Sequence, residues 1–228
     1  MDPGTIILGV LLVLVIVYMI FQSYFSGKTA LTNQIRYDSN PPEIESSKIA
    51  APDALRFSYT IWVYVNNWNT SYKKVIFNRK NETKLYLDAT QSKLICKIGG
   101  DTENSITVTN NFPIQKWVCI TLSLDEKIVD LYLDGKLVKS VQTSGLDNTA
   151  NPYVNEPIKF TGQDNGEGSW DGTFSKFERR PDVTDPHGAW EKYMEGNGGS
   201  TLSRALGNYN VNLSILKDNV ATSKFTLF

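Results

Sequence analysis

Alternation of apolar and polar residues is the feature that most constrains how this chain folds. Between residues 55 and 65 one face collects the apolar side chains of Phe57, Tyr59, Ile61, Val63 and Val65. A period of two is typical of a strand with one buried face. Similar short segments follow, separated by turn signals such as Asp134-Gly135, a pair that suits a type I′ hairpin. The pattern predicts an all-β antiparallel β-sandwich.

One short helix and a terminal hairpin complete the predicted fold. Asp185 can cap the helix, Pro186 suits its first turn, and Gly196 ends it. After a Gly-rich segment, residues 208–216 and 219–228 form two further alternating stretches. We expect these stretches to pair as a hairpin that extends a sheet edge or binds a partner.

The N-terminal segment predicts a transmembrane helix. No charged residue occurs from residue 5 to residue 25. At about 1.5 Å per residue, roughly twenty residues span the ~30 Å hydrocarbon core of a bilayer. A cleaved signal peptide fits less well, because no basic residue precedes the apolar segment. The residues expected to anchor the chain are Thr5, Ile6, Ile7, Leu8, Val10, Leu11, Leu12, Val13, Leu14, Val15, Ile16, Val17, Tyr18, Met19, Ile20 and Phe21.

These patterns divide the chain into four segments. We expect a membrane anchor at residues 1–25, a polar Pro-containing linker at 26–54, the β-sandwich at 55–196 and a C-terminal hairpin extension at 197–228. The first basic residues after the anchor are Lys28 and Arg36, which favours a single-pass protein with its sandwich on the cytosolic side.

Composition argues against several function classes. The formal net charge is −1, so a basic face for nucleic acid is not expected. Cys96 and Cys119 are too few for a disulfide scaffold and lie outside any metal-binding spacing, although one bridge between them stays open. His187 is the single histidine and has no nucleophile motif beside it. We therefore expect no catalytic residues.

Three segments match a known pattern in order: FSYTIWVYVNNW, KWVCITLSLDEKIVDLYLDGKLVKS and IKFTGQDNGEGSWDGTFSKFERR. Together they resemble the concanavalin A-like jelly roll of laminin-G-type domains over about residues 55–195. AWEKYMEGNGG and NVNLSILKDN, with the N-terminal helix, resemble membrane-anchored laminin-G-like proteins of large icosahedral DNA viruses. This narrower resemblance implies a minor capsid protein that links an internal viral membrane to the protein shell.

The resemblance also raises the question of glycoside hydrolysis, because glycosidases share this fold. Their hydrolytic strand resembles ExDxxE, which holds two carboxylates about 5–5.5 Å apart. This string does not occur in the sequence. Asp125, Glu126 and Asp130 flank a turn, and the hairpin explains Asp134. We expect no enzymatic activity.

Two loop tryptophans and one acidic loop are the candidate ligand sites. Sugars stack on aromatic rings, and Trp68 and Trp170 fall in loops, although a packing role is an alternative for both. The loop GQDNGEGSWDG offers hard oxygen ligands that suit calcium, although such loops also form tight turns without a metal. The candidate calcium ligands are Asp164, Asn165, Glu167 and Asp171.

The sequence supports two hypotheses for function. The first is a non-enzymatic structural protein, anchored in the bilayer through residues 5–25, whose sandwich binds other structural proteins such as those of a capsid. The second is a membrane-bound carbohydrate receptor that binds a glycan near Trp68 and Trp170, with or without calcium. Neither hypothesis requires another cofactor.

Overall fold

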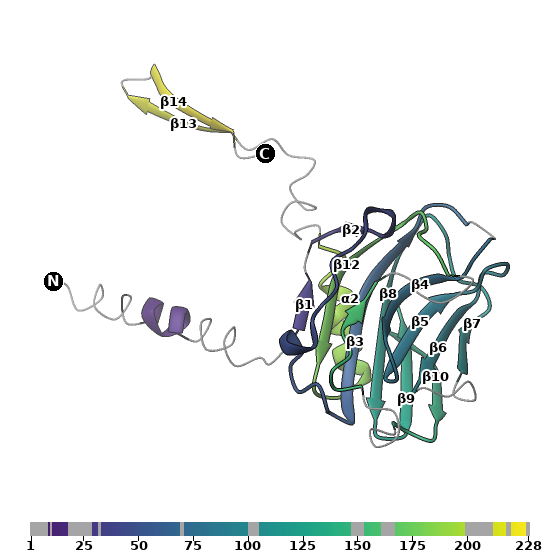
Figure 1. Ribbon diagram of the computed structural model, residues 1–228. Coiled ribbons are helices and arrows are strands. Elements are labelled where there is room, and N and C mark those ends of the chain that lie inside the picture. Colours follow the sequence, from purple (N-terminus) through teal and green to yellow (C-terminus); the bar gives the residue numbers. More distant parts are fainter. Residues whose placement is uncertain are drawn as a thin grey trace.

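The computed structural model describes residues 9, 11–17, 29–31, 33–68, 71–99, 105–146, 153–160 and 167–198, and the backbone of residues 212–217 and 220–226. Two antiparallel sheets pack face to face in these ranges (Figure 1). This arrangement confirms the predicted β-sandwich.

The larger sheet has seven strands, in the order β1-β12-β3-β8-β9-β10, with β2 also paired to β12. Its strands are β1 (Thr29–Leu31), β2 (Ile35–Arg36), β3 (Arg56–Val65), β8 (Trp117–Asp125), β9 (Ile128–Leu133), β10 (Lys136–Gln142) and β12 (Gly172–Arg180). The smaller sheet has five strands, in the order β11-β4-β5-β6-β7. Its strands are β4 (Lys74–Arg79), β5 (Thr83–Leu87), β6 (Leu94–Ile98), β7 (Ser105–Thr109) and β11 (Ile158–Lys159).

The core lies between these two sheets and follows the predicted alternation. All five apolar side chains expected on one face of β3 are buried in it. Asp134 and Gly135 have φ angles of 49° and 75°, as the predicted hairpin between β9 and β10 requires. Cys96 and Cys119 are both buried and free, so no disulfide joins the sheets.

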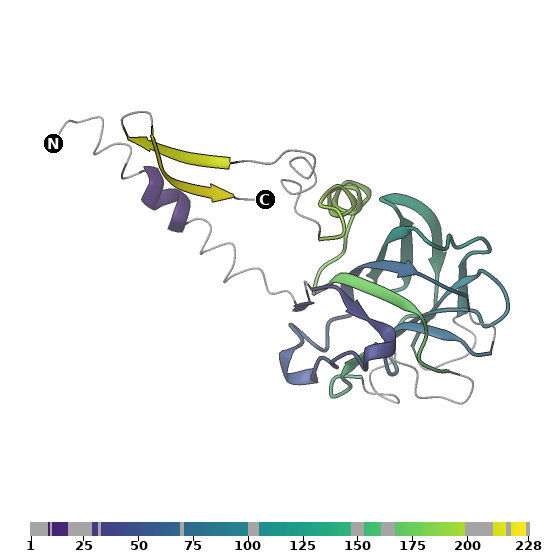
Figure 2. The ribbon, with the colours of Figure 1, turned by 90° about the horizontal axis from the view of Figure 1, so that it is seen from above.

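Among the described residues after β1, the helices are η1 (Tyr37–Ser39), η2 (Ser46–Lys48) and α2 (Pro186–Met194). Asp185 caps α2, as predicted, by accepting a hydrogen bond from the Gly188 N–H at 2.7 Å. Figure 2 shows this helix on the outer side of the larger sheet. There Tyr193 stacks on Trp62, which β3 presents on its face away from the core.

The segment that we expected to be a linker, residues 26–54, lies largely within the sandwich where it is described. β1 and β2 both pair with β12, and Ile44 forms a β-bridge with Ile158. Tyr37, Ile44 and Ile49 are buried in the core. Three widely spaced apolar residues give no periodic signal, yet they are enough to hold this segment against the sheets.

The two chain ends are described only in part. Strands β13 (Asn212–Lys217) and β14 (Val220–Thr226) pair antiparallel, within the segment where the sequence predicts a terminal hairpin. Residues 11–17 are helical, whereas residues 5–8, 10 and 18–25 of the predicted anchor lie outside the described residues. None of the helices in the described ranges has both the length and the apolar character needed to cross a bilayer.

Candidate functional site

Trp170, one of the two predicted ligand residues, belongs to the core. Its side chain is 3% exposed, and its ring stacks on Tyr37 with centroids 4.1 Å apart. Its indole Nε1 donates a hydrogen bond to the Val75 carbonyl at 3.0 Å. Since both the ring and its donor are occupied, we do not assign Trp170 to a ligand site.

Trp68 is half-buried and packs against the same core. Its indole donates to the Ala89 carbonyl at 3.2 Å, and the Lys74 ammonium lies 4.5 Å from its ring centroid. Burial lowers the pKa of Lys74, while the charge of Asp88 raises it. The Lys74 ammonium therefore occupies a position where a ligand could otherwise stack on Trp68.

Two of the four predicted calcium ligands, Asp164 and Asn165, lie outside the described residues. The other two have partners of their own, since Glu167 pairs with Lys84, and Asp171 accepts a hydrogen bond from Asn66 at 2.7 Å. Within the described ranges, no group of three or more His, Cys, Asp or Glu side chains could hold a metal ion. The calcium site stays a prediction.

A row of polar side chains crosses the smaller sheet on the face turned away from the core. Lys159 of β11 lies opposite Asn78 of β4, Asn78 lies opposite Lys84 of β5, and Lys84 lies opposite Lys97 of β6. Residues paired in this way point to the same face of an antiparallel sheet. The register therefore brings together four side chains that are distant in the sequence.

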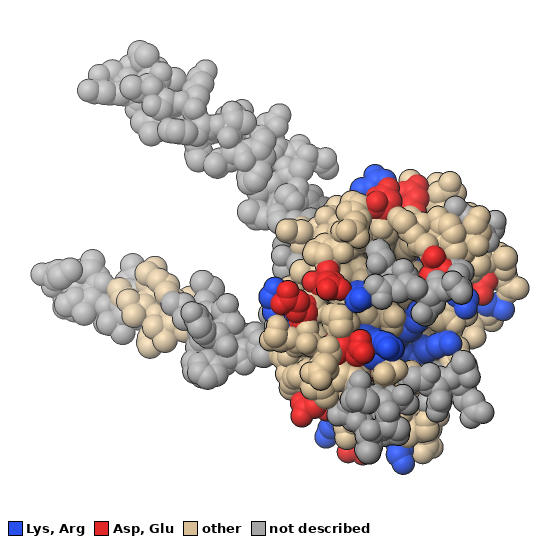
Figure 3. All heavy atoms as spheres, viewed as in Figure 1, with Lys and Arg blue, Asp and Glu red and all other residues tan. Residues whose placement is uncertain are grey.

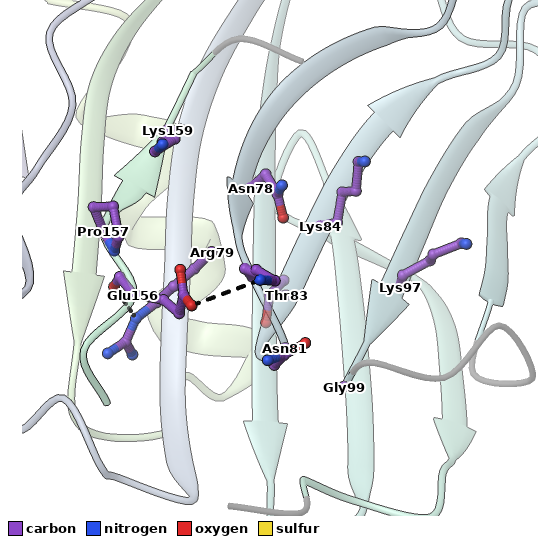
Figure 4. Close-up of a pocket in the computed structure, with 11 residues that line it drawn as sticks. Asn78, Arg79, Asn81, Thr83, Lys84, Lys97, Gly99, Glu156, Pro157 and Lys159 are labelled. Atoms are coloured by element: carbon purple, nitrogen blue, oxygen red, sulfur yellow. Dashed lines mark hydrogen bonds and ion pairs between the residues drawn. The ribbon is translucent and has the colours of Figure 1, made fainter. Parts of the chain in front are cut away.

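This row borders a hollow of about 260 Å³, the candidate site (Figure 4). Figure 4 shows Lys84 and Lys97 extending from neighbouring strands to the same side of the sheet. The hollow is lined by Asn78, Arg79, Lys80, Asn81, Thr83, Lys84, Lys97, Gly99, Glu156, Pro157 and Lys159. Amide, hydroxyl and ammonium groups thus converge on one small volume, as they do in sites that bind polar ligands.

Lysines dominate the charge of the hollow. Lys84 pairs with Glu167, and the Lys159 Nζ lies 3.6 Å from a carboxylate oxygen of Glu43. Lys80 and Glu156 are 4.0 Å apart. Figure 3 shows lysine and arginine side chains gathered over this part of the molecule.

Buried charges beneath the hollow fix its walls. The Arg79 guanidinium donates to the backbone carbonyls of Glu156 and Val154 at 3.1 and 3.3 Å and pairs with Glu82 at 2.5 Å. Arg79 and Glu82 have fully buried side chains. Arg79 therefore ties the segment before β11 to the turn between β4 and β5, which form two sides of the hollow.

Sequence reasoning missed the residues of this row for a physical reason. A polar residue at every second position occurs in any strand with one solvent-facing side. The pairing of Lys159 with Asn78 also depends on a register between strands about eighty residues apart. The one available signal was the recurrence of lysine at outward positions of β5, β6 and β11.

The chain was compared with known proteins at the levels of family, sequence and structure. The family model described as the concanavalin A-like lectin/glucanases superfamily matches residues 43–178. A search of curated proteins found no match.

Among solved structures, the chain is similar to the CBM40 of the Ruminococcus gnavus IT-sialidase bound to alpha2,3 sialyllactose. The TM-score is 0.54 at 10% identity, over 72% of this chain and 97% of that one. It is also similar to the binding domain of Botulinum neurotoxin DC in complex with rat synaptotagmin II, with a TM-score of 0.51 at 11% identity, over 74% and 46% of the two chains.

A third similar structure is the Trypanosoma rangeli sialidase, with a TM-score of 0.51 at 10% identity, over 64% of this chain and 24% of that one. The chain thus spans less than half of the toxin chain and about a quarter of the sialidase chain. Identities this low show a shared fold alone. The family match covers more than half of the 228 residues, and the chain therefore belongs to the concanavalin A-like lectin/glucanases superfamily.

Proposed function

We propose that the chain is a membrane-tethered, non-catalytic carbohydrate-binding protein and that the hollow over β4, β5, β6 and β11 is its binding site. The observation that carries the proposal is the convergence of Asn78, Lys84, Lys97 and Lys159 on one open face. Sugar hydroxyls need both donors and acceptors, and an amide flanked by ammonium groups supplies both.

The lining of the hollow supports binding more than hydrolysis. Glu156 is the one carboxylic acid among the described lining residues, and it is held near Lys80. Most glycosidases hydrolyse the glycosidic bond with two carboxyl groups on opposite sides of that bond. The sialyllactose in the similar CBM40 structure adds support for a glycan ligand in this fold.

The tether is proposed from the N-terminal segment. The helical residues 11–17 are all apolar, and their side chains are exposed. Such a surface is stable when lipid surrounds it, because each buried apolar side chain contributes about 1.5–3 kcal/mol. A tether would also raise the local concentration of the sandwich near glycans on the same membrane.

A glycan panel tests this function. The full chain in detergent micelles is applied to neutral, sialylated and sulfated glycans, beside an Asn78→Ala variant and a Lys139→Met control. Lys139 is exposed on β10, in the other sheet. We expect Asn78→Ala to weaken binding about tenfold through the loss of one or two hydrogen bonds, and the control to bind normally. The proposal fails if no glycan binds, or if Asn78→Ala binds as the parent does.

A structural role as a capsid or other assembly protein is the second candidate, and one observation favours it. Trp190 and Met194 of α2 are 44% and 59% exposed, and Leu137 of β10 is 50% exposed. A Cβ added to Gly135 would lie 2.9 Å from Trp190 Cε3, so Trp190 lies beside the turn that precedes Leu137 by two residues. An exposed apolar surface of this kind commonly binds another protein.

Site-specific crosslinking distinguishes this role. A photoreactive residue at position 190 should crosslink to a neighbouring structural protein in the native assembly, whereas one at position 139 should not. Without a crosslink at position 190, this surface has no assembly role.

A further inference from the structure

This inference rests on the proposed function and deepens it. We infer that the hollow selects acidic sugars, and that the anionic group of the sugar binds between Lys84 and Lys97. In the structure, the carboxylate of Glu167 pairs with the Lys84 ammonium. The acidic sugar takes over this role, so Glu167 is a competitor built into the chain.

Two positively charged side chains are placed next to each other at the proposed anion site. Lys84 and Lys97 lie directly opposite each other on neighbouring strands. Side chains in that position have Cβ atoms about 4.5–5.5 Å apart, and like charges there destabilise a sheet. An anion bound between the two ammonium groups would relieve the repulsion.

The described charged residues around the hollow are mostly basic. Lys80, Lys84, Lys97 and Lys159 face three paired carboxylates, those of Glu43, Glu156 and Glu167. Counted over these described residues alone, the four cations exceed the three anions by one. Within the described ranges, no hydrogen bond or ion pair engages the Lys97 ammonium, which is thus the group available to an incoming anion.

The ion pair that the ligand would open is largely buried. The side chains of Lys84 and Glu167 are 16% and 4% exposed, so their charges interact in a less polar medium than water. A charge-assisted hydrogen bond that an ammonium group donates is stronger there than on an open surface. A sugar carboxylate or sulfate offers the same oxygen acceptors as Glu167.

The width of the row fits a sugar beyond its anionic group. Strands in a sheet are about 4.8 Å apart, so Lys159 lies roughly 10 Å across the sheet from Lys84, with Asn78 between them. A sugar held by its anion at Lys84 and Lys97 would therefore direct its hydroxyl groups toward Asn78 and Lys159.

The test uses two acidic sugars with a shared neutral core. Binding of 3′-sialyllactose, 3′-sulfolactose and lactose to the full chain in micelles is measured by calorimetry, with sodium sulfate as the anion without a sugar. The variants are Lys97→Met, which keeps the aliphatic stem, Glu167→Gln, which removes the competitor, and Lys139→Met as the control. Circular dichroism confirms that each variant is folded.

We expect at least one acidic sugar to bind tenfold or more tightly than lactose and than sulfate. Lys97→Met should abolish that preference, and Glu167→Gln should tighten the acidic sugar several-fold while leaving lactose unchanged. The inference is overturned if both acidic sugars bind no more tightly than lactose, if sulfate alone binds as tightly, or if Lys97→Met behaves as the Lys139→Met control. Binding of neutral glycans in the preceding panel would leave the proposed function intact in each case, whereas a panel without any binding would remove both.

Discussion

Replacement of Glu82 by glutamine should strongly destabilise the sandwich, because Glu82 joins charged groups of both sheets. Its carboxylate accepts hydrogen bonds from Arg79 of the smaller sheet and from Arg179 and Tyr59 of the larger sheet. The side chains of Arg79, Glu82 and Arg179 are fully buried. The substitution keeps the shape of residue 82 and removes the negative charge that pairs with both guanidinium groups.

The expected loss follows from the cost of an uncompensated buried charge. Removal of one partner from a buried ion pair costs about 3–5 kcal/mol. The backbone carbonyls of Ala50 and Val154 still accept hydrogen bonds from the two arginines, so we expect a loss within this range. The free energy of unfolding of an ordinary domain is about 5–15 kcal/mol, so a domain in most of this range should still fold after the substitution.

Urea unfolding of the full chain in micelles, followed by tryptophan fluorescence, measures this loss. Asp125→Asn is the matched control, because it breaks the Arg56–Asp125 pair, which is 3.0 Å long with both side chains half exposed. That exposed pair should contribute less than about 1 kcal/mol. Tyr59→Phe removes a single donor to Glu82 and should cost about 1–2 kcal/mol. If Glu82→Gln costs no more than the control, the cluster does not join the sheets.

Three further substitutions test local features. Burial raises the pKa of the Cys119 thiol from 9.0 to about 12, so the stabilisation from the buried neutral thiol is complete below pH 9 and is lost as the pH rises toward 12. The free energy of unfolding in urea should therefore fall between pH 7 and pH 10, and Cys119→Ala should reduce that fall by on the order of 1 kcal/mol. An unchanged fall in the variant would refute this reasoning. Gly135→Ala should reduce the free energy of unfolding by at least about 1–2 kcal/mol and so lower the melting temperature, because φ at this position is +75° and the added Cβ would lie 2.9 Å from Trp190 Cε3. An unaltered melting curve would contradict this prediction. Asp185→Ala should reduce the free energy of unfolding by about 1 kcal/mol, because it removes the acceptor for the Gly188 N–H, whereas Asp185→Asn should retain stability. Equal losses in the two variants would argue against the cap.

Features that depend on neighbouring residues were predictable from the sequence. The period of two is enough to predict the buried face of β3, and the Asp134-Gly135 pair is enough to predict the hairpin between β9 and β10. The capping residue Asp185 is enough to predict where α2 begins. Each of these signals lies within about ten residues. The burial of Tyr37 and Ile49 could not be predicted in this way, because their partners are distant in the sequence.

The candidate site depends on such distant partners. Loop position suggested Trp170 as a ligand residue, but a loop that crosses the end of a sandwich can place a large ring in the core, where Trp170 stacks on Tyr37. The hollow arises from strand register, which sets Lys84 beside Lys97 and Asn78. A single sequence contains the residues of each strand but not the order in which the strands lie side by side.

The short strand β1 determines how the sandwich would respond to mechanical force. Three residue pairs join β1 to β12 at the edge of the larger sheet, whereas nine pairs join β3 to β8 in its interior. Tension that arrives from the N-terminal side of the chain is thus borne first by β1. Separation of β1 from β12 would add a few extended residues to the segment that precedes the sandwich and would relieve the applied force. The interior strands, and the hollow on the opposite sheet, would then be disturbed only at higher force.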